Sequence, residues 1–108
     1  EYRVPGNVVS IGSGVFYDNK VLEKITLNSG VEAIGNYAFS GCSSLTKLEL
    51  PSSVKKIGYA AFNGCTKLEL SVNSGVEEIG QDAFLDVEQL AYDGKLTGSP
   101  WGAKSIKE

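Results

Sequence analysis

The stretch that decides the fold lies at residues 53–68 and reads Ser53-Val-Lys-Lys-Ile57-Gly58-Tyr-Ala-Ala-Phe62-Asn-Gly-Cys-Thr-Lys-Leu68. Its Ile-Gly dipeptide occurs three more times in the chain, and the copies are separated by 23, 23 and 22 residues. Self-similarity at a fixed period of roughly 20–50 residues is the sequence signature of a repeat protein. The fold must therefore be derived from one repeated unit rather than from the chain as a whole.

Five positions hold the same residue type in all four copies. A valine stands three residues before each isoleucine, the glycine follows it directly, a phenylalanine stands five residues after it, and a leucine six residues after the phenylalanine. The valines are Val8, Val31, Val54 and Val76, and the isoleucines are Ile11, Ile34, Ile57 and Ile79. The phenylalanines are Phe16, Phe39, Phe62 and Phe84, and the leucines are Leu22, Leu45, Leu68 and Leu90.

Each copy leads into a short segment in which apolar residues alternate with polar ones. Residues 22–27 and 45–50 share the pattern Leu-x-x-(Ile/Leu)-x-Leu, whereas residues 68–72 lack one residue between Leu68 and Leu70. That missing residue accounts for the single 22-residue period. Alternation over so short a run predicts a strand with one face buried.

A unit of 23 residues cannot bury a core by itself, but stacked copies turn each apolar position into a continuous column. We therefore expect a solenoid of about four 22–23-residue repeats, with short parallel strands about 4.8 Å apart. The glycines after each isoleucine are predicted to let the chain turn where a Cβ atom would crowd the next coil. The segment between glycine and phenylalanine, such as residues 36–39, is expected to form one helical or 3₁₀ turn.

Composition and charge exclude several classes of function. The 108 residues carry a formal charge of −3 without charge runs, which gives no electrostatic reason to expect nucleic acid as a partner. No stretch approaches the roughly 20 apolar residues that span a bilayer, so no membrane insertion of this segment is expected. The chain has no histidine, the commonest general base and a common metal ligand. Metal sites, cofactors and catalytic residues are therefore not expected.

The residues quoted above, together with Val31-Glu-Ala-Ile-Gly-Asn-Tyr-Ala-Phe-Ser-Gly-Cys-Ser-Ser-Leu45, closely resemble the BspA-like class of leucine-rich repeats. The resemblance covers roughly residues 6–92 and implies a leucine-rich-repeat-type solenoid. It further implies a bacterial surface or secreted protein and hence an extracellular or cell-surface location. Some such proteins are implicated in adhesion to host matrix proteins, to cells or to other bacteria, so the implied role is a non-catalytic interaction module. The partner would be an unknown protein or glycan. A structural spacer within a larger surface protein stays open as the alternative.

The two ends of the chain depart from the repeat. Tyr2-x-Val4-Pro5 aligns with Leu48-x-Leu50-Pro51, so residues 1–5 are interpreted as the end of a truncated preceding repeat. Residues 6–92 hold the four repeats, and residues 93–108 are expected to form a C-terminal cap and tail. Because a solenoid must cover its last apolar coil, Trp101 is the predicted lid.

The two cysteines and the paired carboxylates have structural explanations. Cys42 and Cys65 are one period apart, so a disulfide is geometrically conceivable, but side chains in one column point in parallel. We expect two buried free thiols, as Val87 in the same column suggests. Glu77 and Glu78 could indicate acid–base chemistry, but Glu32, Lys55 and Glu77 align as a charge ladder on a solvated face.

Candidate partner-binding residues come from two parts of the repeat. Tyr17, Tyr37 and Tyr59 fall near the same turn, and tyrosine provides contact area at little entropic cost. Partial packing of these rings against a neighbouring turn is the alternative interpretation. The outward strand residues are mixed in charge and small, and no aromatic or basic cluster among them marks a hot spot; they are Glu23, Lys24, Thr26, Thr46, Lys47, Glu49, Glu69 and Ser71. The sequence therefore leaves the partner-binding residues undetermined, with Tyr37, Tyr59, Lys24, Lys47 and Glu49 as candidates.

Overall fold

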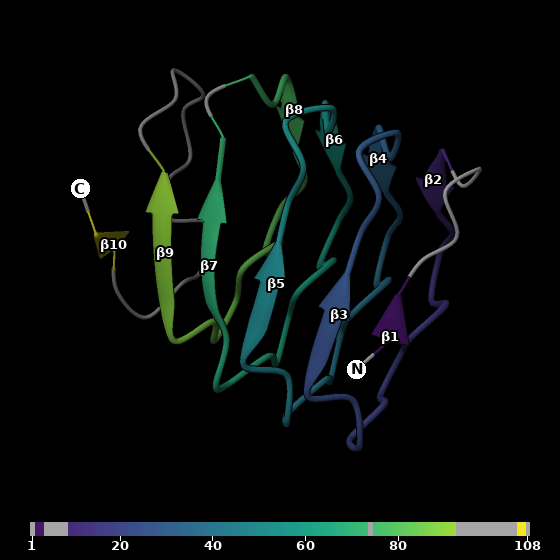
Figure 1. The fold of residues 1–108 in the computed structure, drawn as a ribbon. Helices are drawn as coiled ribbons and strands as arrows, with labels where there is room; N and C mark the ends of the chain where they lie inside the picture. Colours follow the sequence, from purple (N-terminus) through teal and green to yellow (C-terminus); the bar gives the residue numbers. More distant parts are fainter. Residues whose placement is uncertain (1, 4–8, 74, 93–105, 108) are drawn as a thin grey trace.

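The computed structural model describes residues 2–3, 9–73, 75–92 and 106–107. The chain winds as a solenoid whose coils contribute to two parallel sheets, one behind the other in Figure 1. The larger sheet has six strands in the order β1-β3-β5-β7-β9-β10, and the smaller has four in the order β2-β4-β6-β8. The larger sheet comprises β1 (Tyr2–Arg3), β3 (Lys24–Thr26), β5 (Lys47–Glu49), β7 (Glu69–Val72), β9 (Gln89–Tyr92) and β10 (Ile106–Lys107). The smaller comprises β2 (Ser10–Ile11), β4 (Ala33–Ile34), β6 (Lys56–Ile57) and β8 (Glu78–Ile79).

The strand register reproduces the period found in the sequence. Leu48 in β5 pairs with Ile25 in β3 on one side and with Leu70 in β7 on the other. The second of these steps spans 22 residues, which confirms that the residue missing from the third copy lies before β7. Because every described pair is parallel and in register, each repeat position forms a column along the solenoid axis. The expected leucine-rich-repeat-type solenoid of about four coils is confirmed.

The phenylalanine column fills the centre of the core. Phe39, Phe62 and Phe84 are fully buried, and Phe16 in the first coil is half-buried. The ring centroids of Phe16–Phe39 and Phe39–Phe62 are each 5.2 Å apart, and those of Phe62–Phe84 are 5.9 Å apart. In all three pairs the rings are stacked and nearly parallel, as expected of one side chain repeated at the inter-coil distance. The buried column expected from the repeat is therefore confirmed for Phe39, Phe62 and Phe84.

The repeat glycines lie where successive coils approach each other most closely. A Cβ atom built on Gly35, Gly58 or Gly80 would lie 2.7, 2.6 or 2.5 Å from a backbone nitrogen of the preceding coil. Real Cβ atoms essentially never come so close to backbone, so a side chain at these positions would push two coils apart. The predicted role of these glycines is therefore confirmed.

The expected helical or 3₁₀ turn at residues 36–39 is wrong. The segment is instead a succession of β-turns, in which Tyr37 has a φ of +58° and Gly41 a φ of +79°. Its N–H groups alternate: Ala38 and Ser40 donate within their own coil, whereas Tyr37, Phe39 and Gly41 donate to carbonyls of the next coil. A helix directs all its N–H groups along its own axis and would leave these inter-coil bonds unmade.

The position predicted for Leu90 is also wrong. The sequence places Leu90 in the column of Leu45 and Leu68, but β9 pairs Leu90 with Leu70. Val87 keeps its place in the cysteine column, because its N–H bonds to the Phe84 carbonyl as that of Cys65 does to Phe62. The fourth coil therefore reaches the larger sheet two residues earlier than the third, since only two residues separate Val87 from Leu90.

Both end segments pair with the larger sheet. Tyr2 in β1 lies opposite Ile25, which is the alignment that the sequence indicated. Ile106 in β10 lies opposite Leu90. Trp101, the predicted lid, lies outside the described residues, as do residues 93–105 as a whole.

Candidate interaction surface

The outer face of the larger sheet gathers the strand candidates predicted from the sequence. Within each strand the central apolar residue points into the core, and Ile25, Leu48 and Leu70 are at most 4% exposed. Their neighbours along the strand point outward because side chains alternate between the faces of a sheet. Lys47 and Glu49 on either side of Leu48 are accordingly exposed.

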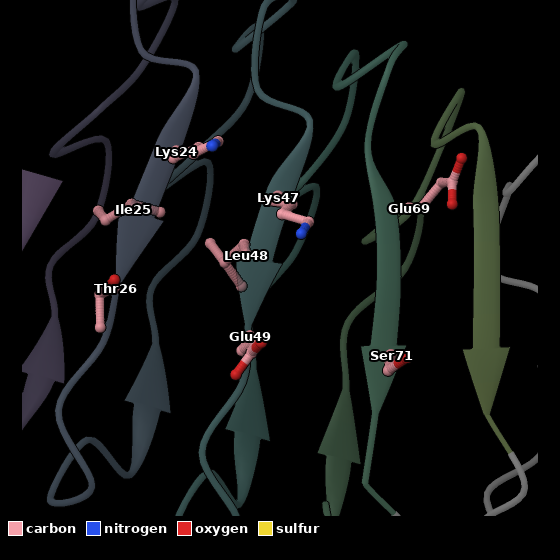
Figure 2. A pocket seen from close by; sticks show the side chains of 8 residues that line it. All are labelled: Lys24, Ile25, Thr26, Lys47, Leu48, Glu49, Glu69 and Ser71. Carbon is pink, nitrogen blue, oxygen red and sulfur yellow. The ribbon is translucent and has the colours of Figure 1, made fainter. Parts of the chain in front are cut away.

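Parallel register orders these outward side chains in two rows. Lys24, Lys47 and Glu69 pair in sequence along one row, and Thr26, Glu49 and Ser71 along the other. These six residues, here named the strand face, surround an open hollow of about 340 Å³ (Figure 2). A second hollow of about 190 Å³ continues across Glu69 and Ser71 to Gln89 and Ala91 in β9. The hollows cross at least three coils without a deep pocket, which suits an extended contact rather than an enclosed small molecule.

The charges of the strand face have no partners in the part of the chain that the structure describes. Two lysines elsewhere are paired: Lys20 lies 3.0 Å from Asp18, and Lys56 lies 3.5 Å from Glu78, whereas Lys55 and Lys67 form no ion pair with a described residue. Neither Lys24 nor Lys47 forms such a pair with a described residue, although the two occupy directly opposed positions of neighbouring strands. Like charges in that arrangement are destabilising, so the fold gains nothing from this lysine pair.

The charge ladder expected on the smaller sheet is shifted by one residue. Glu32, Lys55 and Glu77 are exposed as predicted. The ion pair that forms nevertheless joins Lys56 and Glu78, which are directly paired in β6 and β8. Register within the strands therefore decides which charges meet.

The tyrosine candidates lie apart from the strand face. Tyr37 and Tyr59 follow β4 and β6 in the turn segments, on the side of the solenoid that neither sheet occupies. Their ring centroids are 5.4 Å apart, and Tyr17 packs on Tyr37 at 6.3 Å, both in edge-to-face geometry. The five candidates predicted from sequence thus divide between two surfaces. Glu69 and Ser71, which strand alternation predicts to point outward, also line the hollow but were not among these five.

The two thiols are buried away from any surface. Cys42 and Cys65 are free and fully buried, and they donate to the carbonyls of Phe16 and Phe39 at 3.2 and 3.1 Å. The adjoining Cys42 side chain and burial together raise the pKa of the Cys65 thiol far above its ordinary value. A protonated, inaccessible thiol is not a nucleophile.

No three described His, Cys, Asp or Glu side chains come together in a way that would hold a metal ion. The described residues also contain no helix long and apolar enough to cross a bilayer.

Solved structures with the same architecture come from bacteria. A leucine-rich repeat protein from Bacteroides ovatus ATCC 8483 superposes with a TM-score of 0.82 at 28% identity, over 98% of this chain and 30% of that one. The pneumococcal vaccine antigen PcpA superposes with a TM-score of 0.82 at 27% identity, over 97% of this chain and 27% of PcpA. The T. pallidum protein TpLRR, at 22% identity and a TM-score of 0.69, shares the fold over 96% of this chain and 67% of its own.

The chain thus spans less than a third of the length of the first two relatives. No curated protein matches the sequence. The BspA type leucine-rich repeat region, however, matches residues 1–92 in six copies. The repeat columns, the parallel register and this match lead to one conclusion: the chain belongs to the BspA-type leucine-rich repeat family.

Proposed function

We propose that this chain is a non-catalytic protein-interaction module of a bacterial cell-surface or secreted protein, and that the strand face is its contact surface. The observation that carries the proposal is the set of unpaired charges on that face. Lys24, Lys47, Glu49 and Glu69 are exposed around one hollow and form no ion pair with a described residue. Residues that do not stabilise the fold are free to serve recognition.

The chemistry of the strand face favours a polypeptide partner. Cationic and anionic side chains lie on adjacent strands, and Ser71 on β7 lies opposite Glu49 on β5. Such a mixed surface complements a segment that carries charges of both signs, and charge complementarity chiefly increases association rate and specificity. The similarity to a pneumococcal vaccine antigen supports a location outside the cell.

Adhesion to host matrix is the proposed use of this surface, by analogy with the family rather than from the geometry. The test is surface plasmon resonance of the immobilised chain against a panel of purified extracellular-matrix proteins. Lys24→Glu/Lys47→Glu should reduce binding at least about tenfold and weaken its dependence on salt. Lys67→Glu, a charge reversal at an exposed turn position, serves as the matched control and should change little.

The outcome separates the proposal from its alternative. If no matrix protein binds, or if the Lys67 and strand-face variants behave alike, the strand face is not a recognition surface for these proteins. The chain would then be better explained as a structural spacer, with recognition carried elsewhere in the parent protein.

A further inference from the structure

Three exposed tyrosines form a ladder along the side of the solenoid that carries the turns. Tyr17, Tyr37 and Tyr59 come from three successive coils and are 61%, 41% and 41% exposed. Tyr37 lies between the other two, and its ring plane is inclined to theirs by 80° and 76°. We name these three residues the tyrosine ladder. Its edge-to-face contacts orient the rings before any ligand arrives, which lowers the entropy cost of binding.

The ladder is not a consequence of the repeat. Tyr17 stands six residues after its repeat isoleucine, Tyr37 three and Tyr59 two. The residues at the equivalent positions of other coils are Ser40, Asn63 and Leu85 for Tyr17, Gly14, Ala60 and Asp82 for Tyr37, and Ser13, Asn36 and Gln81 for Tyr59. None of them is aromatic, so the fold does not need an aromatic ring at any of the three positions.

The backbone of Tyr37 strengthens this point. Its φ of +58° lies in the left-handed region, as do those of Gly14, Ala60 and Asp82 at the same repeat position. Glycine adopts this conformation freely, whereas a residue with a large side chain is disfavoured there. A tyrosine is therefore kept at this position despite its effect on stability, which is typical of functional sites.

The groups around the ladder are rich in hydrogen-bonding atoms and carry little net charge. Ser13, Asn36 and Gln81, at the repeat position of Tyr59, are all exposed. The nearby Asp18 is neutralised by Lys20 at 3.0 Å, and Asp82 on the next coil is half-buried. Desolvation and the adjacent Tyr59 raise the pKa of the Tyr37 hydroxyl above its ordinary value, so that hydroxyl stays protonated and can both donate and accept hydrogen bonds.

The exposed area of the ladder restricts the class of ligand. An aromatic side chain can bury roughly 150–250 Å², so the exposed fractions leave about 200–350 Å² of tyrosine surface. A specific protein interface buries about 800 Å² on each partner. The ladder alone is too small for that, but its area suits a chain of a few sugar rings, whose C–H faces stack on aromatic rings while their hydroxyls bond to neighbouring amides and hydroxyls.

We propose that the tyrosine ladder, with Asn36 and Gln81 beside it, binds a neutral oligosaccharide. This site is separate from the strand face and does not depend on the function proposed for that face. Phenol hydroxyls and side-chain amides would hydrogen-bond the sugar hydroxyls, and the rings of Tyr37 and Tyr59 would carry most of the stacking.

The test uses substitutions that the chain itself provides at equivalent repeat positions. Tyr37→Gly copies Gly14, and Tyr59→Gln copies Gln81. The unmodified chain and both variants are applied to immobilised neutral oligosaccharides of galactose, glucose and N-acetylhexosamines, and to sialylated and sulfated forms of the same sugars. Affinity for the best neutral binder is then measured by calorimetry. Far-UV circular dichroism and thermal unfolding verify the fold.

We expect the unmodified chain to bind neutral sugars, and each variant to bind at least about tenfold more weakly while unfolding at the same or a higher temperature. Lys24→Glu/Lys47→Glu should leave the affinity for sugars unchanged, which keeps this proposal distinct from the first. The proposal is overturned if no neutral sugar binds, if only sialylated or sulfated sugars bind, or if the tyrosine variants bind as well as the unmodified chain. It is equally overturned if the variants lose only binding to a matrix protein, which would make the ladder part of a protein interface.

Discussion

Truncating Phe39 to alanine should remove about 3–5 kcal/mol from the free energy of unfolding, the range for deleting a fully buried aromatic ring. Phe39 is 0% exposed, and its ring lies between those of Phe16 and Phe62, with both centroids 5.2 Å away. The cavity cannot close by relaxation, because the Phe39 N–H is bonded to the Ala61 carbonyl of the next coil at 2.8 Å and the two sheets hold the coils at a fixed spacing. The loss should therefore fall in the upper part of the range.

The same substitution at Phe16 is the matched control. Phe16 is half-buried in the first coil, where its ring stacks on that of Phe39. Because less of its surface leaves water on folding, Phe16→Ala should cost no more than about 2 kcal/mol. Domains of this size unfold with about 5–15 kcal/mol in total, so only the interior substitution should remove a large part of the stability.

Equilibrium unfolding in urea, followed by far-UV circular dichroism, measures both variants. The slope against urea concentration should stay constant, so that a shift in midpoint reports stability alone. Equal losses at Phe16 and Phe39, or a loss below about 1.5 kcal/mol at Phe39, would mean that the column is not the centre of the core. Phe39→Leu, which keeps most of the side-chain volume, should retain much of the stability that Phe39→Ala loses.

Three further predictions concern the close backbone approach and the thiols. Gly58→Ala should lower the free energy of unfolding by about 1–3 kcal/mol, because the new Cβ atom would lie 2.6 Å from a backbone nitrogen of the preceding coil. Gly12→Ala is the control: among the described residues its Cβ atom would meet a valine methyl at 3.2 Å, so the urea midpoint should change little. A thiol titration should count two reactive groups in denatured, unreduced protein and none within minutes in the native protein, because Cys42 and Cys65 are free and fully buried. A count of zero after denaturation would reveal a disulfide. The raised pKa of Cys65 means that above a pH of about 8.5 the unfolded chain loses a proton that the folded chain keeps. Stability should therefore fall as the pH rises, with a slope that approaches about 1.4 kcal/mol per pH unit well above 8.5. Urea midpoints of Cys65→Val between pH 8.5 and 9.5 should lack this decline.

The inward positions of the coil could be predicted from the sequence because each is constrained only by packing in the core. A column such as Phe39, Phe62 and Phe84 must bury the same shape in each coil, so the same residue recurs and its period is visible. The positions of the repeat glycines could be predicted for the same reason, because the close backbone contact at Gly58 leaves no room for a side chain. Fold class, period and core followed from these positions alone.

The backbone of the turns could be predicted less well. Residues 36–39 have a length compatible with a helical turn, and nothing in the residue type of Ala60 signals its φ of +52°. A clearer signal existed four residues further on in each coil, where Asp18, Gly41, Gly64 and Asp86 all have positive φ. A column that contains only glycine and aspartate favours left-handed turns, which is evidence against a helix in this segment.

Leu90 shows that sequence distance from the preceding phenylalanine does not always predict the column in which a residue lies. Its distance from Phe84 matches the earlier copies, yet the strand pairing assigns it to the column of Leu70. Both columns take leucine, so residue type cannot distinguish them. Only the hydrogen bonds between coils, here from the Gln89 N–H to the Leu68 carbonyl, fix which leucine enters which column.

The outward positions differ from the core in a way that bears on function. A core column can be predicted because stable packing requires the same residue type in every coil. Surface positions carry no such requirement, so their residues can instead be adapted to a binding partner. Lys24 opposite Lys47, and three tyrosines from three different repeat positions, are both arrangements that the stacking of coils does not require. For a repeat protein, departures from the period on the surface are therefore a better guide to binding sites than the period itself. That criterion points to the tyrosine ladder, whereas Lys24 and Lys47 occupy the same repeat position and are singled out by the direct opposition of two like charges.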